Sequence, residues 1–246
     1  MFAKILIAAL VASPLVVAHG KVSVVTGDAG GNTTALGIQG GVVPGAGSNS
    51  KTEVDTTIFN SLSAASDGLG RTEGQGKNTL TGMSAVVAQS GSTLPQVSQG
   101  GSLSGTLHIV TTDGAGPYTA IVDPTGTGAF STGTKATVTQ QVPGTFGEIS
   151  PSGQTLRFMS RMLVKMGLMK RAANVNKDYP FSVAIPAGTT CTGTVGGQSG
   201  VCLVKMANPN PAGPFGGVFA MQMAGAASNT TSAATTSAKA GTKFVA

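Results

Sequence analysis

Glycine divides this chain into short stretches, and this spacing limits the possible folds more than any other feature of the sequence. There are 37 glycines, and charged residues make up only 10% of the chain. Such a density argues against a helical bundle, because glycine in a helix interior costs about 1 kcal/mol relative to alanine. The stretches between the glycines are rich in Val, Ile and Thr and are bounded by Gly, Pro, Asn or Asp. This pattern predicts a mainly β fold, either a sandwich or a barrel.

The clearest strand pattern lies in residues 102–111, where apolar and polar residues alternate. Leu103, Leu107 and Ile109 share one face of this strand with Gly105, and His108 falls on the opposite face. Further strands are expected at 21–25, 83–88, 118–122, 134–139, 181–186 and 201–205.

One segment breaks the β pattern. In residues 152–176, Leu and Met recur at three- and four-residue spacing among basic side chains, which indicates one amphipathic helical insertion or a mobile insertion. A helix packed on the β domain is favoured over a helix that binds a membrane surface or a partner. The role of the basic, Met-rich part at 155–171 stays open.

The N-terminus has the order of a secretory signal peptide. Lys4 is followed by the apolar run 5–17, which ends on the small residue Ala18. An uncleaved anchor is the alternative. We expect residues 1–18 to be removed and the β domain to span 19–223 in a secreted, extracellular protein. Residues 224–246 are mostly Ala, Ser and Thr, too polar to bury a core, and are expected to form a disordered tail.

An extracellular location decides how the two cysteines are interpreted. Cys191 and Cys202 are expected to form one disulfide, with a free pair as the alternative. The sequence also contains two acceptor motifs for N-glycosylation, at Asn32 and Asn229. A metal site built on the two cysteines alone is not expected, because further ligands are missing nearby.

The charge is basic but dilute, with a formal net charge of +6. Two Tyr, no Trp and no clustering of Arg with aromatic residues argue against nucleic-acid binding. We expect a monomer that does not enter a membrane and that is attracted weakly to anionic walls or surfaces. A hydrolase is disfavoured, because the nine acidic residues are scattered and no Ser-His-Asp or paired-carboxylate pattern can be placed.

The two histidines are the clearest candidates for metal ligands in the sequence. Cleavage after Ala18 would make His19 the first residue, so that its α-amine and its imidazole could chelate one metal ion. His108 is the other histidine, and it would complete a three-nitrogen set of the kind that Cu(II) prefers. We therefore predict a copper site at His19 and His108. The alternative is that His19 falls at the cleavage site by chance and that His108 is an ordinary strand residue.

Several motifs resemble the fungal Egh16-like family of secreted proteins associated with infection structures. They extend over nearly the whole mature domain, and the runs at 113–117 and 212–217 are the most specific. The motifs are Ala18-His-Gly20, Thr26-Gly-Asp-Ala-Gly-Gly31, Ala35-Leu-Gly37, Gly82-Met-Ser-Ala85, Leu94-Pro-Gln-Val-Ser98, Leu107-His-Ile-Val-Thr-Thr-Asp-Gly-Ala-Gly-Pro117, Cys191-Thr-Gly-Thr-Val195, Val201-Cys-Leu-Val204 and Ala212-Gly-Pro-Phe-Gly-Gly217.

That family is in turn similar to lytic polysaccharide monooxygenases, in which an N-terminal histidine and a strand histidine bind copper. The resemblance implies an immunoglobulin-like or fibronectin-like β-sandwich with long glycine-rich loops. It also implies one copper ion on His19 and His108, and an axial aromatic residue, either Tyr179 or Phe181. The alternative for either aromatic residue is core packing.

Three further positions enter through the resemblance or lie near the predicted site. Asp113 lies in a glycine-rich turn after His108, where stabilising the turn is favoured over a contact with the site. The family often has an additional cysteine pair, and Met206 and Val218 stand at plausible positions for it.

Three functions remain. The first is a copper-dependent polysaccharide monooxygenase that cleaves chitin or another wall glycan, such as glucan, during host infection. The second is a non-catalytic secreted virulence protein that binds cell-wall polymer or a host surface. The third is a copper carrier. The substrate and the regiochemistry of oxidation stay open.

Overall fold

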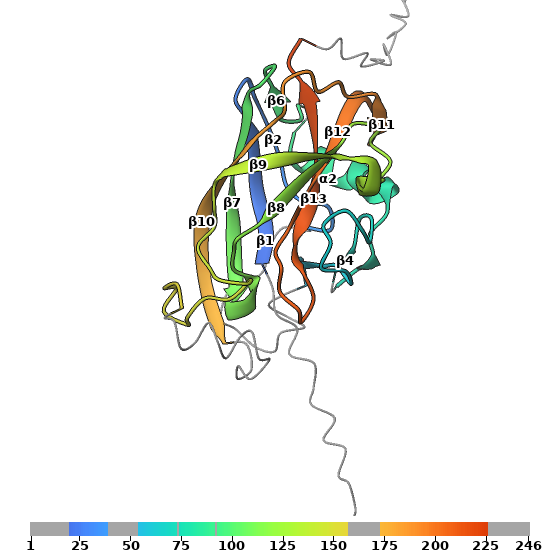
Figure 1. Ribbon diagram of the computed structural model, residues 1–246. Coiled ribbons are helices and arrows are strands. Elements are labelled where there is room, and N and C mark those ends of the chain that lie inside the picture. The colour runs from blue at the N-terminus through green and yellow to red at the C-terminus, as the bar shows by residue number, and fades with distance from the viewer. Residues whose placement is uncertain (1–19, 39–53, 73, 92, 157–172, 226–246) are drawn as a thin grey trace, which may run out of the picture.

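The computed structural model of the protein describes residues 20–38, 54–72, 74–91, 93–156 and 173–225 (Figure 1). The predicted signal peptide, His19 and Asn229 lie outside the described residues, as do most of the basic Met-rich segment and nearly all of the predicted tail.

Seven strands form a closed ring (Figure 1). The strands are β1 (Gly20–Gly27), β7 (Ser102–Thr111), β8 (Thr119–Asp123), β9 (Thr134–Gln140), β10 (Asn174–Ala184), β12 (Gln198–Ala207) and β13 (Phe215–Met223). They are hydrogen-bonded in the order β12-β8-β9-β10-β7-β1-β13, and β13 pairs again with β12. Within this ring only the β1–β13 pair is parallel.

The prediction of a mainly β fold is confirmed, but the arrangement is a closed barrel instead of an immunoglobulin-like sandwich. The difference arises at β12, which pairs with β8 on one side and with β13 on the other. Because this strand joins both neighbours, no free edges remain to separate the seven strands into two sheets. The expected strands at 21–25, 102–111, 118–122, 134–139, 181–186 and 201–205 correspond to β1, β7, β8, β9, β10 and β12.

The barrel interior is filled by alternate residues of these strands. In β7, Leu103, Leu107 and Ile109 are fully buried, as their alternation predicts. Burial of each such side chain stabilises the fold by about 1.5–3 kcal/mol. Gly105 lies on the same face, and a Cβ atom at this position would come within 2.5 Å of the Phe181 ring. The missing side chain at Gly105 therefore makes the space that the Phe181 ring occupies in the core.

A second apolar cluster covers the outside of β12 and β13, and it contains the helix α2 (Met83–Gln89). The prediction of a strand at 83–88 is wrong. Met83, Val86 and Val87 are buried at helical spacing, so the segment presents one apolar face to the barrel as a single short helix. Within the described ranges, no helix combines the length and the apolar character that crossing a membrane requires.

Short elements surround the barrel. The strands among them are β2 (Gly30–Thr33), β3 (Thr57–Ile58), β4 (Arg71–Thr72), β5 (Gly76–Lys77), β6 (Gln96–Val97) and β11 (Gly193–Val195). The described part of the chain also contains the single-turn helices η1 (Leu80–Gly82), η2 (Thr112–Gly114) and η3 (Phe130–Thr132). The β3, β4 and β5 strands extend the sheet from β13.

The predicted disulfide between Cys191 and Cys202 is present, with 4.8 Å between the two Cα atoms. A disulfide is typical of proteins outside the reducing cytosol. The suggestion that Met206 and Val218 replace a second cysteine pair is wrong. Met206 belongs to the interior cluster and Val218 to the outer cluster, so their side chains point to opposite faces of neighbouring strands. Cysteines at these two positions could not be bridged.

Candidate metal site

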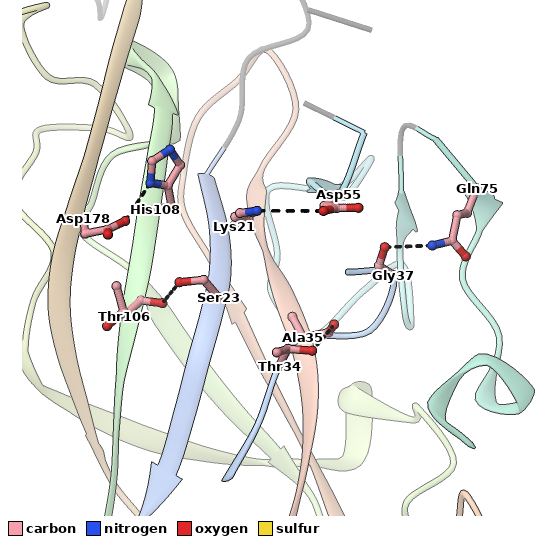
Figure 2. A network of polar contacts seen from close by, with 10 residues as sticks. All are labelled: Lys21, Ser23, Thr34, Ala35, Gly37, Asp55, Gln75, Thr106, His108 and Asp178. Atoms are coloured by element: carbon pink, nitrogen blue, oxygen red, sulfur yellow. Dashed lines mark hydrogen bonds and ion pairs between the residues drawn. The ribbon is translucent and has the colours of Figure 1, made fainter. Parts of the chain in front are cut away.

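His108 is the middle residue in a row of three side chains on neighbouring strands. It pairs with Lys21 of β1 on one side and with Asp178 of β10 on the other. Residues that are directly opposite in antiparallel strands share a face, so all three side chains lie on the same side of the sheet. Figure 2 shows His108 directed toward Asp178, and Lys21 directed toward Asp55. The predicted placement of His108, opposite to the core-facing residues of its strand, is confirmed.

The imidazole of His108 is held by one nitrogen and leaves the other nitrogen for a ligand. Its Nδ1 lies 2.6 Å from Oδ1 of Asp178, whose side chain is largely exposed. A neutral imidazole that donates its Nδ1 proton to this carboxylate has its lone pair on Nε2. This Nε2 atom is buried and has no hydrogen-bond partner among the described residues. A buried polar atom without a partner is rare, and its partner can be a water molecule or an ion.

Lys21 brings a positive charge to the same row. Its side chain is buried, and its Nζ atom lies 3.8 Å from Oδ2 of Asp55. Burial lowers the pKa of Lys21, and the nearby carboxylates of Asp55 and Asp178 oppose this shift. The cation is therefore balanced by carboxylates on two sides. Sequence reasoning did not single out Lys21, Asp55 or Asp178, because only the strand register and the tertiary fold bring them together.

The first described residue, Gly20, shows how tightly the start of β1 is packed. Gly20 pairs with Ile109, and a Cβ atom at position 20 would lie 2.5 Å from the carbonyl oxygen of Gly114 and 2.6 Å from the hydroxyl of Tyr118. That hydroxyl donates a hydrogen bond to the same carbonyl oxygen, and burial raises the pKa of Tyr118. His19 lies outside the described residues, but its covalent neighbour is fixed at the end of β1 that carries Lys21.

The two axial candidates lie on the other face of the sheet. Tyr179 pairs with Leu107 and Phe181 pairs with Gly105, so both aromatic rings share the core-facing side. Phe181 is buried in the core, whereas the half-buried Tyr179 donates a hydrogen bond from its hydroxyl to the carbonyl oxygen of Gly153. Burial also raises the pKa of Tyr179. The structure thus brings neither ring to the side on which His108 lies.

Asp113 has a structural place in η2. Its Oδ1 atom accepts a hydrogen bond from the Thr111 hydroxyl at 2.9 Å, and its carbonyl oxygen accepts one from Nδ2 of Asn208. These contacts agree with the turn-stabilising role that the sequence favoured. Among the described residues, no group of three or more His, Cys, Asp and Glu side chains is placed to hold a metal ion. A metal at His108 would therefore need ligands from another part of the chain.

Comparison with known proteins connects the chain to a family. The family model described as Egh16-like virulence factor matches residues 17–216. The appressoria-specific virulence factor GAS1 of Pyricularia oryzae is 38% identical over 227 residues, which cover 92% of this chain and 80% of that relative. The appressoria-specific virulence factor GAS2 of the same fungus is 34% identical over 157 residues, which cover 63% of this chain and 45% of that relative. No solved structure matches the chain.

Proposed function

Since the chain belongs to the Egh16-like family of virulence factors, we propose that it is a secreted, virulence-associated protein that binds one copper ion. The α-amine and imidazole of His19 and the Nε2 atom of His108 would hold this ion. The names of the relatives support a role in fungal virulence. The copper site is an inference from the residues of this chain.

The proposal rests on the hydrogen bonding of the two ring nitrogens of His108. Its Nδ1 is fixed by Asp178, and its Nε2 is buried without a partner in the described part of the chain. Histidines that bind metals commonly donate their other ring proton to a carboxylate, which fixes the tautomer and makes the ligating nitrogen more basic. A histidine that served only to stabilise the strand would gain by satisfying both of its nitrogens.

The remaining two nitrogens come from His19 if the signal peptide is removed after Ala18. His19 directly precedes Gly20, which pairs with Ile109 at the start of β1. Because consecutive Cα atoms are about 3.8 Å apart, this pairing limits how far His19 can be from that end of the strand. Cu(II) prefers nitrogen ligands in a tetragonal arrangement and binds them more tightly than the other divalent first-row metals do. An amine and two imidazoles fit this ion better than they fit Mg²⁺ or Ca²⁺, which prefer oxygen ligands.

Bound copper would supply one-electron oxygen chemistry for the oxidative cleavage of chitin or another wall polysaccharide. The chain's own contribution would be to orient His108 through Asp178 and to present a surface to the polymer. One exposed aromatic ring lies at the same end of the barrel. The loop that carries Phe146, which is 43% exposed, is hydrogen-bonded to the Ala115–Gly116 segment next to Gly114. Aromatic faces of this kind can pack on sugar rings.

A second candidate is a non-catalytic protein that binds wall polymer or a host surface. Lys21 favours this alternative, because a buried cation directly opposite His108 opposes the binding of a second cation there. The carboxylates of Asp55 and Asp178 reduce this opposition, since both act on the Lys21 charge.

Titration with Cu(II) tests the proposal on protein that begins at His19. We expect one ion to bind with a Kd below about 1 µM and the affinity to fall by orders of magnitude in His108→Ala. A matched protein with one additional alanine before His19 keeps both imidazoles but blocks the chelating amine, so it should lose affinity too. Weak copper binding that neither His108→Ala nor the additional alanine affects would refute the copper site and leave the non-catalytic function. Product assays on chitin and glucan then separate an oxidase from a copper carrier.

A further inference from the structure

A groove of about 450 Å³ lies on the outer side of the barrel, and its lining comes from β1, from β2 and from the end of α2. Its volume is in the range of sites that take small ligands. Hydroxyl and amide side chains form most of the lining, and the lining residues are all uncharged. Such a surface suits a neutral molecule that carries many hydrogen-bonding groups, such as a sugar, better than it suits an ion.

The side chain of Asn32 faces this groove from β2. Asn32 pairs with Thr26 of β1, so the two side chains share one face of the sheet. The neighbouring pair, Val25 and Thr33, is buried, which places Asn32 on the opposite, outer face. Asn32 is exposed, and its side-chain amide makes no hydrogen bond within the described part of the chain. The amide nitrogen is therefore available to carry a substituent.

The backbone that carries Asn32 is held firmly. Its own N–H donates a hydrogen bond to the carbonyl oxygen of Thr93 at 3.1 Å. The preceding residue, Gly31, has φ 70°, and a Cβ atom at that position would overlap the carbonyl oxygen of Leu94. A group attached to Asn32 would therefore start from a fixed point beside the groove, and it would lose little conformational entropy when it packs there.

The sequence around Asn32 specifies the chemistry of such a group. Asn32-Thr33-Thr34 is an acceptor motif for N-glycosylation, in which an oligosaccharide is joined to the side-chain nitrogen of the asparagine. Thr34 provides the hydroxyl that the motif requires, and it lines the same groove. The first sugar of an N-glycan is N-acetylglucosamine, a neutral ring with hydroxyls, an amide and a methyl group. The groove thus lies next to the attachment point of a ligand that matches its lining.

Val24 gives this sugar an apolar surface to cover. Val24 lines the groove, and 45% of its surface is exposed. It lies two residues before Thr26 on β1 and therefore on the same outer face. At the end of α2, the side-chain amide of Gln89 is exposed and makes no hydrogen bond within the described ranges. A sugar ring in the groove could cover Val24 and offer its polar groups to Gln89.

We propose that Asn32 carries an N-glycan whose first sugar packs in this groove over Val24, so that this sugar forms part of the folded surface. The inference rests on secretion, which is one part of the proposed function, and it does not depend on copper. Covering one half-exposed apolar side chain is a small gain, of a size that raises the Tm of a domain of this length by about 2–4 °C.

Secretion of the full chain from a eukaryotic host tests the proposal, with Asn229→Gln to leave Asn32 as the remaining acceptor motif. The mass of the secreted protein should show one N-glycan, which Thr34→Ala removes and Thr34→Ser retains. Enzymatic trimming to the first sugar should leave the Tm unchanged. Asn32→Gln, which carries no sugar, should lower the Tm by about 2–4 °C.

Two controls separate the sugar from the substitution. In protein made in a host that does not glycosylate, Asn32→Gln should change the Tm by less than about 1 °C, because the exposed amide makes no hydrogen bond there. In Val24→Ser, the Tm difference between the trimmed protein and its Asn32→Gln counterpart should largely disappear, because the sugar then covers no apolar side chain.

The possible failures are distinguishable. Secreted protein without a glycan at Asn32 would overturn the inference and leave secretion intact. A glycan whose first sugar leaves the Tm unchanged would show that the sugar extends into solvent. An undiminished Tm difference in Val24→Ser would exclude the groove as the place where it packs. Retention of an unglycosylated chain inside the cell would refute secretion together with this inference. The copper titration is independent of all these results.

Discussion

The Nζ atom of Lys205 lies 3.8 Å from the centroid of the Phe59 ring, in the fully buried space behind the loop 60–70. A cation over an aromatic face is attracted by the electrons of the ring, and the attraction grows when water is excluded. The same ammonium binds two carbonyl oxygens of the loop. Lys205 thus connects β12 of the barrel to the loop 60–70 through one charged group.

The lowered pKa of Lys205 leads us to expect a specific dependence of the free energy of unfolding on pH. Burial lowers the pKa of Lys205 from 10.5 to about 8, although Asp67 opposes this shift. The unfolded chain therefore holds this proton more tightly than the folded protein does, and the Lys205 contribution makes the protein more stable as the pH rises above about 8. Urea unfolding between about pH 7.5 and 9.5 should show a gain of about 1 kcal/mol relative to Lys205→Met, which lacks the titrating group. Parallel curves for the two proteins would contradict the prediction.

Asp178 should control copper affinity through His108. In Asp178→Asn the carboxylate that holds Nδ1 is replaced by a neutral amide, so the imidazole becomes less basic and its tautomer is less well fixed. We expect the copper affinity to fall about 10–100-fold while the fold is retained. Asp28→Asn removes a carboxylate that bonds to Ser98 and Ser102 instead, and it should leave copper binding unchanged. An equal effect of both substitutions would show that Asp178 acts only through net charge.

Gly20 should not tolerate a side chain. Its Cβ position lies too close to the Gly114 carbonyl oxygen and the Tyr118 hydroxyl, so Gly20→Ala should destabilise the protein by about 1–3 kcal/mol. Removing the hydroxyl in Tyr118→Phe should relieve one of the two contacts and recover part of this loss in the double variant. Urea unfolding of the single and double variants measures the coupling. Strict additivity of the two changes would mean that the hydroxyl is not the obstacle.

We expect Phe146 to lower the free energy of unfolding, because its backbone has a positive φ angle. The backbone of Phe146 has φ 52° and that of Gly147 has φ 80°, and the turn is closed by two hydrogen bonds between Thr145 and Glu148. Asn and Gly are preferred at the first such position, and a bulky residue there is strained. Phe146→Asn is therefore expected to raise the free energy of unfolding by about 1 kcal/mol.

If the Phe146 ring contacts polysaccharide, the same variant should bind insoluble chitin or glucan less well. Leu62→Asn is the control, because it replaces a 62% exposed apolar residue in the loop 60–70. A variant that gains stability and loses polymer binding would show that the strained turn serves recognition. Unchanged polymer binding would show that the strained turn plays no part in recognition of the polymer.

Alternation within single strands could be predicted from the sequence, whereas relations between strands could not. The faces of β7 follow from the period of two, so Leu107 and His108 were placed correctly on opposite sides. The apolar residues of α2 fit a strand as well as a helix over so few residues, and only their packing on β12 and β13 decides between the two.

The surroundings of His108 depend on register. Lys21 and Asp178 come to His108 because β1 and β10 pair with β7 at particular residues, and a shift of one residue would turn both side chains to the other face. The same limit applies to Met206 and Val218, which are close in space but on opposite faces. The cavity lined by Asn60, Arg71, Lys77 and Thr127 depends on loops and two short strands that carry little pattern.

The parallel pairing of β1 with β13 joins the two ends of the domain. During synthesis, β1 emerges from the ribosome before any other strand of the ring, and the ring can close only after β13 has followed. Contacts between such distant segments make folding slow compared with that of helical proteins. The barrel therefore cannot close until the chain has been made as far as β13. A protein that ended before Phe215 would lose the strand that pairs with Lys21 at the start of β1.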